Sequence, residues 1–337
     1  MKNSRDAPIR CAIILSGGEG QRLRPLIHQL RGDALPKQYV NFIGTRSMLE
    51  HTYHRAEKLI HPDRLFTVVN EDHFRYPDVC RQLSARPPET VVLQPENKET
   101  GPGLLLPLMH LSKHYPESVV TVFPSDHFIL EEDPFMDHVD LACQAVERDP
   151  SRLVLLGAVP YELEPEYGYI LPGAEVKDSV FSSLHQVLRF IEKPELHAVP
   201  ELVQQGGLWN TFVMVFQART MLSLMCRAVP VLHRAFQRIG KALGTAREMD
   251  EVKEVYREMK PLNLSRELLA VLPIEYPSHL SVLPVRGVFW SDWGSEIRIL
   301  SDLKKIGYTT GLRVSDAVAH QFAVKASEPH TQIWLQA

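Results

Sequence analysis

The sequence predicts an α/β fold whose mixed, mostly parallel sheet carries helices on both faces. Two observations support this prediction: a series of short apolar, β-branched runs, and helical periodicity between them. The runs cover residues 11–15, 65–69, 90–93, 119–123 and 153–158. Short runs that stay apolar at every position are typical of strands buried on both faces. Their alternation with helices indicates parallel strands joined by helical crossovers.

Three segments repeat apolar residues with the spacing of a helix. These are residues 49–60, 104–115 and 135–146. Pro102 and Pro134 are expected in the first turns of the last two helices, where proline is tolerated. Loops that follow buried strands are the places where such folds bind their ligands.

The pattern changes after about residue 160. Strand-like runs at 169–171, 187–191 and 211–216 have little helix between them, which predicts an antiparallel extension of the sheet. Residues 221–259 are mainly helical, and residues beyond Gly311 show no clear period. We therefore expect one domain over residues 7–310 and a short C-terminal extension over 311–337.

Composition excludes several classes of protein. The 337 residues are 44% hydrophobic and 23% charged, with a formal net charge of -4, as in ordinary soluble globular proteins. This charge gives no bulk attraction to nucleic acids or acidic membranes. No stretch approaches the length of a membrane span, and the four cysteines are scattered without a metal-binding pattern. We expect a cytoplasmic protein with reduced thiols, and the sequence leaves open whether it is a monomer or a homodimer.

A glycine-rich segment follows the first predicted strand. It reads SGGEGQRL over residues 16–23, and Lys37 follows Pro36 shortly afterwards. Such a loop presents backbone N–H groups to phosphates, to which Arg22 would add a planar donor and Lys37 a point charge. The spacing is neither that of a P-loop nor that of a dinucleotide-binding loop. Taken alone, the glycines are equally consistent with a tight turn between a strand and a helix.

Two further motifs place charged groups at the ends of predicted strands. Asp126 follows the run at 119–123, where a carboxylate can hold a hard cation beside phosphates. Glu192 and Lys193 follow the run at 187–191. The alternatives are a turn or capping role for Asp126 and a solvated ion pair for the other two.

The glycine-rich segment, LSGGEGQRLRPL followed by LPKQY, resembles the signature of the sugar-1-phosphate nucleotidyltransferases, in the form used by the mannose-1-phosphate guanylyltransferase branch. The later motifs resemble those of the family in the same order: PENKETGP at 95–102, PSDH at 124–127, EPEYGYI at 164–170, EKP at 192–194, LWNT at 208–211 and WSDWGS at 290–295. PKQY followed by MLEHT also resembles the methylerythritol-phosphate cytidylyltransferases, which are shorter chains.

The resemblance implies a Rossmann-like fold of the nucleotidyltransferase type with an antiparallel sugar-binding extension. It implies Mg²⁺-dependent transfer of GMP from GTP to α-D-mannose 1-phosphate, giving GDP-mannose and pyrophosphate. The residues it assigns to catalysis are Arg22, Lys37 and Lys193; to the nucleotide, Leu15, Gly17, Gly18, Gly20, Gln21, Arg22, Lys37, Pro95, Thr100 and Asp126; to the sugar, Gly168, Tyr169, Glu192, Lys193 and Asn210; and to the metal, Asp126 and Asp292.

Two departures from the family pattern keep alternatives open. Gln21 stands where threonine is usual, and Phe212 stands where a glycine would lie near the sugar. A nucleotidyltransferase for glucose, heptose or another sugar 1-phosphate is therefore the first alternative. A non-catalytic nucleotide-sugar-binding relative is the second, although the retained charged residues argue against it. The glycine spacing disfavours a dehydrogenase.

Overall fold

The computed structural model describes residues 8–176 and 183–308. The strands are β1 Arg10–Leu15, β2 Leu65–Asn70, β3 Val91–Gln94, β4 Val119–Pro124, β5 Phe128–Ile129, β6 Leu153–Ala158, β7 Gly168–Glu175, β8 His185–Glu192, β9 Leu208–Gln217, β10 Leu280–Val285 and β11 Trp290–Ser291. The helices are α1 Arg24–Arg31, α2 Met48–Ala56, α3 Pro77–Leu83, α4 Thr100–His114, α5 Glu132–Arg148, α6 Val199–Gln204, α7 Ala218–Ala228, α8 Pro230–Ala242, α9 Glu248–Glu258, α10 Leu272–Glu275 and α11 Glu296–Lys305. The predicted C-terminal extension lies outside the described residues, so the domain boundary stays a prediction.

The main sheet has the strand order β3-β2-β1-β4-β9-β6-β10-β8-β7. Strands β3, β2, β1 and β4 are parallel, as predicted. Beyond them the prediction of a mostly parallel sheet is wrong. Strand β9 is antiparallel to β4, β6 and β7, and β8 is antiparallel to β7 and β10. Parallel neighbours need long crossover connections, and the chain between β7 and β9 contains little helix.

The second half of the sheet closes on itself. Because β7 pairs with β9 as well as with β8, strands β9, β6, β10, β8 and β7 form a ring. The fold is thus an open parallel sheet joined through β9 to a closed, mixed one. The antiparallel extension predicted from the sequence is part of this ring.

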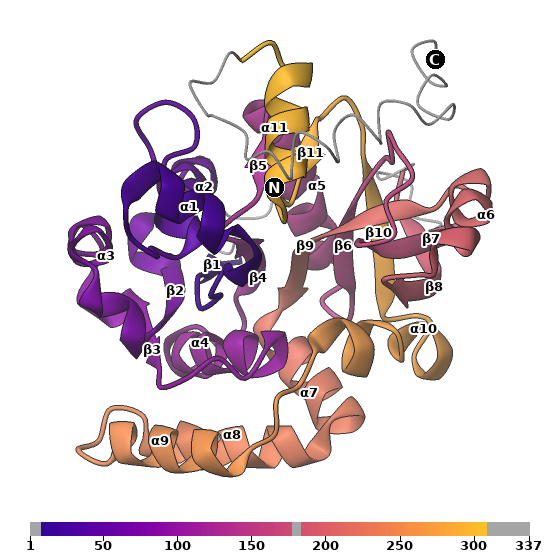
Figure 1. The fold of residues 1–337 in the computed structure, drawn as a ribbon. Helices are drawn as coiled ribbons and strands as arrows, with labels where there is room; N and C mark the ends of the chain where they lie inside the picture. The colour runs from indigo at the N-terminus through magenta and orange to yellow at the C-terminus, as the bar shows by residue number, and fades with distance from the viewer. Residues whose placement is uncertain (1–7, 177–182, 309–337) are drawn as a thin grey trace, which may run out of the picture.

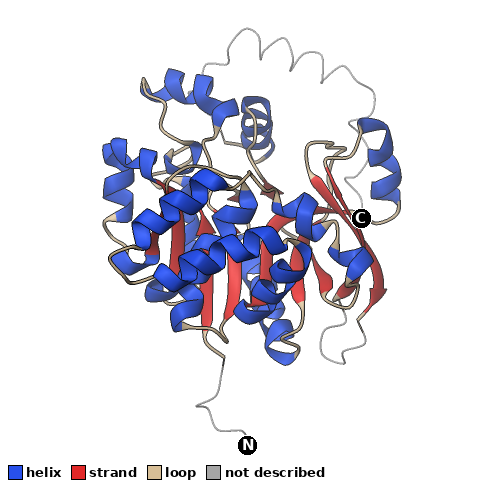
Figure 2. Cartoon of the chain, turned by 90° about the horizontal axis from the view of Figure 1, so that it is seen from below, coloured by secondary structure: helices blue, strands red, loops and turns tan. Residues whose placement is uncertain are grey.

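Helices cover both faces of the sheet, as predicted (Figures 1 and 2). Alternate residues of β1 show the division. Cys11 and Ile13 belong to the apolar cluster that contains the buried faces of α4, α7, α8 and α9. Ala12 and Ile14 belong to the opposite cluster, with α2, α5 and α11. Helices α8 and α9 form an outer layer beneath α4 (Figure 1).

The predicted helices are confirmed, with one shift of boundary. Helix α2 begins after Ser47, whose hydroxyl accepts from the Glu50 N–H while the Glu50 carboxylate accepts from the Ser47 N–H. It ends at Ala56, before Ile60, which stays buried in the turn that follows. Pro102 and Pro134 lie in the first turns of α4 and α5.

Two further expectations can be compared with the structure. The cysteines of the described chain are all free, and Cys80 and Cys226 are exposed. Over residues 8–176 and 183–308, we find no helix with both the length and the apolar character that crossing a bilayer requires.

The segments that carry the candidate site residues lie together at one edge of the sheet. The carboxyl ends of β1, β4 and β6 lie beside the start of β9, because β9 runs antiparallel to β4 and β6. The glycine loop follows β1, Asp126 follows β4, and Asn210 lies near the start of β9. The site is expected at this edge.

Candidate active site

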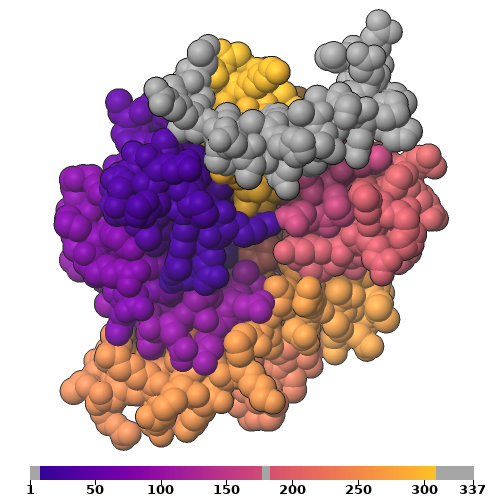
Figure 3. Space-filling model, in the orientation of Figure 1, coloured from indigo at the N-terminus to yellow at the C-terminus, as the bar shows by residue number. Residues whose placement is uncertain are grey.

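Two adjoining cavities open at this edge of the sheet. One has a volume of about 730 Å³ and the other about 440 Å³. They share the side chains of Asn97, Glu99, Asp126, His127 and Asp292. Figure 3 shows the hollow in the middle of this face, between the indigo N-terminal part and the pink segment of the ring.

Most of the predicted site residues line these cavities. The larger cavity is lined by Gly20, Gln21, Arg22, Lys37, Pro95, Asp126 and Asp292. The smaller is lined by Leu15, Gly17, Gly18, Thr100, Asp126, Gly168, Glu192, Asn210 and Asp292. The nucleotide set therefore divides between the two cavities, and the sugar set belongs to the smaller one.

The glycine loop is held by the segment that follows Pro36. The Gln38 amide donates to the carbonyl oxygens of Ser16 and Gly18, each at 2.8 Å. Gly20 has a φ of +56°, and a Cβ there would lie 2.9 Å from the Cβ of Lys37. The loop shape therefore requires glycine at this position. The glycine loop and the segment at 36–39, which are separate in the sequence, therefore form one structural unit.

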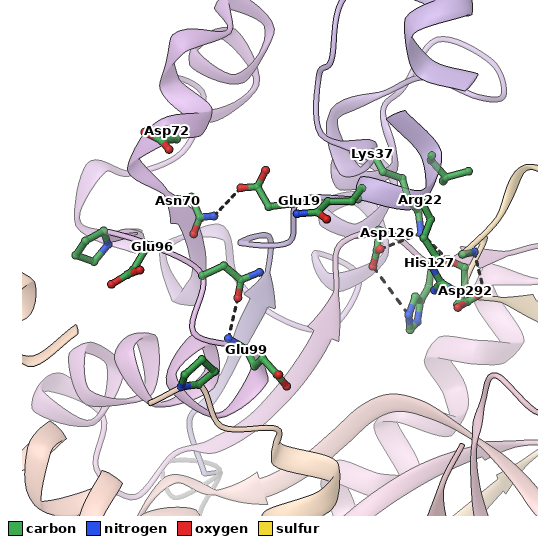
Figure 4. A pocket seen from close by; sticks show the side chains of 17 residues that line it. Glu19, Arg22, Lys37, Asn70, Asp72, Glu96, Glu99, Asp126, His127 and Asp292 are labelled. Carbon is green, nitrogen blue, oxygen red and sulfur yellow. Dashed lines mark hydrogen bonds and ion pairs between the residues drawn. The ribbon is translucent and has the colours of Figure 1, made fainter. Parts of the chain in front are cut away.

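Lys37 connects two of the loops at this edge of the sheet. Its side chain is only 4% exposed, and Nζ lies 2.9 Å from Asp126 Oδ2. The same ammonium donates to the backbone carbonyl of Asp292. It thus links the ends of β4 and β11 at the junction of the cavities (Figure 4).

Asp126 is ionised at neutral pH. Burial is the largest influence and would raise its pKa, but the charge and hydrogen bond of Lys37, together with His127, outweigh burial and hold the pKa below its usual value. Burial lowers the pKa of the neighbouring His127 to about 4, so this imidazole is neutral. Trp290 Nε1 donates to His127 Nδ1 at 3.3 Å. The neutral ring therefore carries its proton on Nε2, which lies 4.0 Å from Asp126 Oδ1.

Asp292 is fixed by three donors. Its Oδ1 accepts from the Tyr167 hydroxyl at 3.2 Å, from the Gly294 N–H at 2.8 Å and from Arg298 Nη1 at 2.5 Å. Arg298 is 7% exposed, and its Nη2 lies 2.6 Å from Glu164. Burial is the largest influence and acts to raise the pKa of Asp292, but Arg298, Lys37 and the Gly294 N–H together outweigh it and hold the pKa below its usual value.

Arg22 spans the mouth of the cavities. Its guanidinium forms an ion pair with Glu166, and both side chains are about half exposed. A Cβ at Gly294 would lie 2.9 Å from Arg22 Nη2 and 2.6 Å from Asp292 Oδ2. A side chain at position 294 would therefore displace both of these side-chain ends.

The donor set at the junction fits Mg²⁺ that is shared with a phosphate. One oxygen of Asp126 pairs with Lys37, and Asp292 Oδ1 is occupied by its three donors, so each carboxylate has one oxygen left. In the part of the chain that the structure describes, no group of three or more His, Cys, Asp or Glu side chains could hold a metal. Mg²⁺ commonly binds through one or two carboxylates together with substrate phosphates and water.

The smaller cavity combines polar and aromatic groups. Glu192 is opposite Gly168 in the β7–β8 pair, and a Cβ at Gly168 would lie 2.9 Å from its Oε2. Burial raises the pKa of Glu192. Asn210 contributes an amide from β9, and Trp290 is one of the aromatic walls. Carboxyl and amide groups together can match hydroxyls, which both donate and accept.

Two predicted sugar contacts lie elsewhere. Tyr169 is fully buried below the cavity, where its hydroxyl donates to the Glu164 carbonyl and accepts from Trp209 Nε1. It supports the loop and is not among the residues that line the two cavities, so its assignment to the sugar stays a prediction. Lys193 is exposed in the turn after β8 and is not among the residues that line the two cavities. Its catalytic role stays a prediction.

Sequence reasoning missed several lining residues. Those of the larger cavity are Asn70, Asp72, Glu96 and Asn97, and those of the smaller are Tyr167, Asn263, Ser265 and Trp290. Two signals could have found some of them, because Asn70 ends a predicted strand and Glu96 belongs to the PENKETGP motif. No pattern in the sequence marks Arg298, whereas its partner Glu164 opens the EPEYGYI motif.

An α/β sheet with a cationic group and two carboxylates at the junction of two cavities is typical of proteins that bind phosphorylated small molecules. Comparison with known families makes this class specific. The chain belongs to the nucleotidyl transferase family, whose pattern matches residues 11–305.

The chain is similar to several characterised proteins. It is 32% identical over 228 residues to a mannose-1-phosphate guanylyltransferase of Escherichia coli, which covers 67% of this chain and 46% of the relative. It is 31% identical over 240 residues to the xanthan biosynthesis protein XanB of Xanthomonas campestris, with 71% and 48% covered. The chain thus spans about half the length of these curated relatives.

A solved structure supports the same fold. The protein from Thermus thermophilus titled mannose-1-phosphate geranyltransferase is 25% identical, with a TM-score of 0.72. The match covers 87% of this chain and 79% of that one. The nucleotidyltransferase-type α/β architecture expected from the sequence is therefore confirmed.

Proposed function

We propose that this chain transfers GMP from GTP to α-D-mannose 1-phosphate, giving GDP-mannose and pyrophosphate. One observation carries the proposal: Lys37, Asp126 and Asp292 meet at the junction of two cavities, one beside the glycine loop and one lined by hydroxyl-binding groups. The names of the curated relatives favour the guanylyl group and the mannosyl acceptor. We place the reaction in the cytoplasm, as the sequence predicts.

The reaction joins two anions. An oxygen of the sugar phosphate forms a bond to the α-phosphorus of GTP, and the bond from this phosphorus to the oxygen bridging to the β-phosphate breaks. The attacking phosphate needs no general base, because the second pKa of a phosphate monoester is about 6. Catalysis therefore consists of positioning and charge neutralisation.

Residues of the chain supply both the positioning and the charge neutralisation. Lys37, fixed by its two acceptors, places a positive charge at the junction where the two phosphates meet. Arg22, released from Glu166, supplies a planar donor to the departing pyrophosphate. Glu192 and Asn210 orient the sugar through its hydroxyls. Lys37 is held in place by the fold before substrate arrives, whereas Arg22 must first leave Glu166.

Asp126 and Asp292 are the residues that would hold Mg²⁺, with one free carboxylate oxygen each. The cation would supply further neutralisation of phosphate charge between the two substrates. Since Asp126 is ionised at neutral pH, it can accept a cation there without first losing a proton.

The proposal is tested by a matrix of substrates. Each of GTP, ATP, UTP and CTP is combined with mannose, glucose and heptose 1-phosphates, and pyrophosphate release is measured with Mg²⁺ present. We expect the highest kcat/KM for GTP with mannose 1-phosphate. The Lys37→Met variant should lose activity, whereas Lys241→Met, on the exposed end of α8, should not.

Two results would contradict this proposal, and each would favour a different alternative. A clear preference for another sugar phosphate or nucleotide would keep the reaction type and change its substrates. Tight binding of GDP-mannose without pyrophosphate release from any pair would identify a non-catalytic binding protein.

A further inference from the structure

Phe212 has a backbone conformation that aromatic residues rarely adopt. Its φ is +57°, in the left-handed region. Across residues 8–176 and 183–308, the other non-glycine residues with positive φ are Glu99, Lys193 and Trp293. A bulky residue in this region is strained, and such strain persists where the surroundings enforce it.

A bulge in β9 enforces the conformation of Phe212. The pairing of β9 with β6 passes from Asn210↔Gly157 directly to Met214↔Leu155, so residues 211–213 are opposite Leu156 alone. Bulges of this kind redirect side chains and are common beside active sites. Here the bulge turns the backbone at the point where β9 borders the smaller cavity.

Side chains of the bulge replace the missing ladder hydrogen bonds. The Asn210 Oδ1 accepts from the Phe212 N–H at 3.0 Å. The Thr211 hydroxyl donates to the Leu156 carbonyl at 2.6 Å and accepts from the Val213 N–H at 3.2 Å. The strained turn is therefore built by its neighbours and does not depend on the phenyl ring itself.

The ring of Phe212 is part of the wall of the smaller cavity. It lies with Glu192, Asn210 and Trp290 among the lining residues and is half-buried against the apolar cluster below the sheet. The polar members of this set can bind hydroxyls, but the ring can only fill space or cover an apolar face. The C–H groups of a pyranose carry partial positive charge and suit the negative face of an aromatic ring.

We propose that Phe212 determines sugar specificity: its ring limits the smaller cavity to unsubstituted hexose 1-phosphates and excludes those with a bulky acylamino group. This inference rests on the proposed function. The sequence already departs from the family pattern at this position, where a glycine is usual. A glycine there would keep the left-handed turn and leave the cavity larger.

The test uses a matched pair of variants, Phe212→Gly and Phe212→Ala. Both remove the ring, but only glycine adopts the left-handed conformation without strain. We measure kcat/KM for mannose 1-phosphate and for an N-acetylhexosamine 1-phosphate, KM for GTP, and the thermal midpoint. Leu188→Ala, at a position on β8 that is 63% exposed, is the control.

We expect the ratio of kcat/KM for mannose 1-phosphate to kcat/KM for the N-acetylhexosamine 1-phosphate to fall at least about tenfold in both variants. A change in pocket volume typically produces an effect of this size. KM for GTP should stay within about twofold, and the glycine variant should have the higher thermal midpoint. Unchanged selectivity in both variants, or a parallel rise in KM for GTP, would overturn the inference.

The two proposals fail in different ways. Wild-type pyrophosphate release reports on the proposed function, and the ratio between variant and wild type reports on Phe212. A wild-type enzyme that is active but whose selectivity is insensitive to ring removal overturns the role of Phe212 alone. A wild-type chain that is inactive with every sugar phosphate overturns both.

Discussion

Replacing Arg298 by methionine should destabilise the protein and misplace Asp292. Arg298 lies 2.5 Å from Asp292 and 2.6 Å from Glu164, and its guanidinium lies 4.6 Å from the centroid of the Tyr167 ring. The methionine would leave both carboxylates in a poorly solvated position without their counter-charge. The three partners come from two separate segments of the chain, the loop before β7 and the turn after β11.

The size of the effect follows from this geometry. Removing one partner of a buried ion pair costs about 3–5 kcal/mol. Arg298 serves two carboxylates, of which Asp292 is 22% and Glu164 10% exposed, and this residual solvation offsets part of the second loss. We therefore expect a loss of about 4 kcal/mol, a large share of a total stability of about 5–15 kcal/mol. The thermal midpoint should fall by about 10 °C.

The assay is urea denaturation of four chains: wild type, Arg298→Met, Glu164→Gln and the double variant. Glu164→Gln in the Arg298→Met background removes a stranded charge, so the double variant should lose less than the sum of the single losses. We expect a coupling energy of about 1–3 kcal/mol. Turnover of Arg298→Met should fall at least about tenfold, because Asp292 loses one of its three donors.

Two outcomes would refute this reasoning. A loss below about 1 kcal/mol would mean that water solvates the carboxylates as well as Arg298 does. Additive single losses would mean that Arg298 and Glu164 do not interact. An Arg298→Lys control should be intermediate, since an ammonium cannot serve both carboxylates with a planar fork.

Three further predictions follow from the site. Lys37→Met should lower turnover at least about 100-fold without abolishing GTP binding, as measured by steady-state assays and equilibrium binding. Near-normal turnover would contradict the role of Lys37 beside Asp126. Glu166→Gln should lower KM for GTP about two- to fivefold by freeing Arg22, since an exposed pair is worth about 0–1 kcal/mol; a higher KM would show that Glu166 itself aids binding. Asp302→Asn should stabilise the protein at pH 8 by up to about 3 kcal/mol and by much less at pH 4.5, measured by urea denaturation at both pH values. Burial raises the pKa of Asp302 to about 6, so between pH 4 and pH 6 the native state binds more protons than the unfolded state and stability falls as pH rises. A stabilisation that does not change with pH would contradict this explanation.

The sequence predicted the central strands and the loops that carry the site. Continuous apolar runs identified β1, β2, β3, β4 and β6, because strands buried on both faces need apolar residues at every position. Since the ends of such strands meet at one edge, the apolar runs alone were enough to bring Asp126 and the glycine loop together. The order of motifs added Asp292, which follows β11.

The remainder depends on packing that no local pattern records. The ring closes because β7 pairs with both β8 and β9, and sequence spacing does not reveal which strands become neighbours. Arg298 and Glu164 are 134 positions apart, so their ion pair depends on the docking of α11 against the loop before β7. Lys193 shows that a sequence motif does not fix the position of a side chain. It was assigned to the site from the EKP motif, but it lies exposed in the turn after β8.

The double pairing of β9 restricts how the molecule can move. One edge of this strand is hydrogen-bonded to β6. The other edge is hydrogen-bonded to β7 at its start and, further along, to β4, which leads to Asp126. A hinge motion that swung the halves apart would have to break this continuous ladder of backbone hydrogen bonds. We therefore expect any movement that accompanies ligand binding at the proposed site to be confined to loops at the edge of the sheet, such as 16–20 and 159–167, and to leave the sheet itself unchanged.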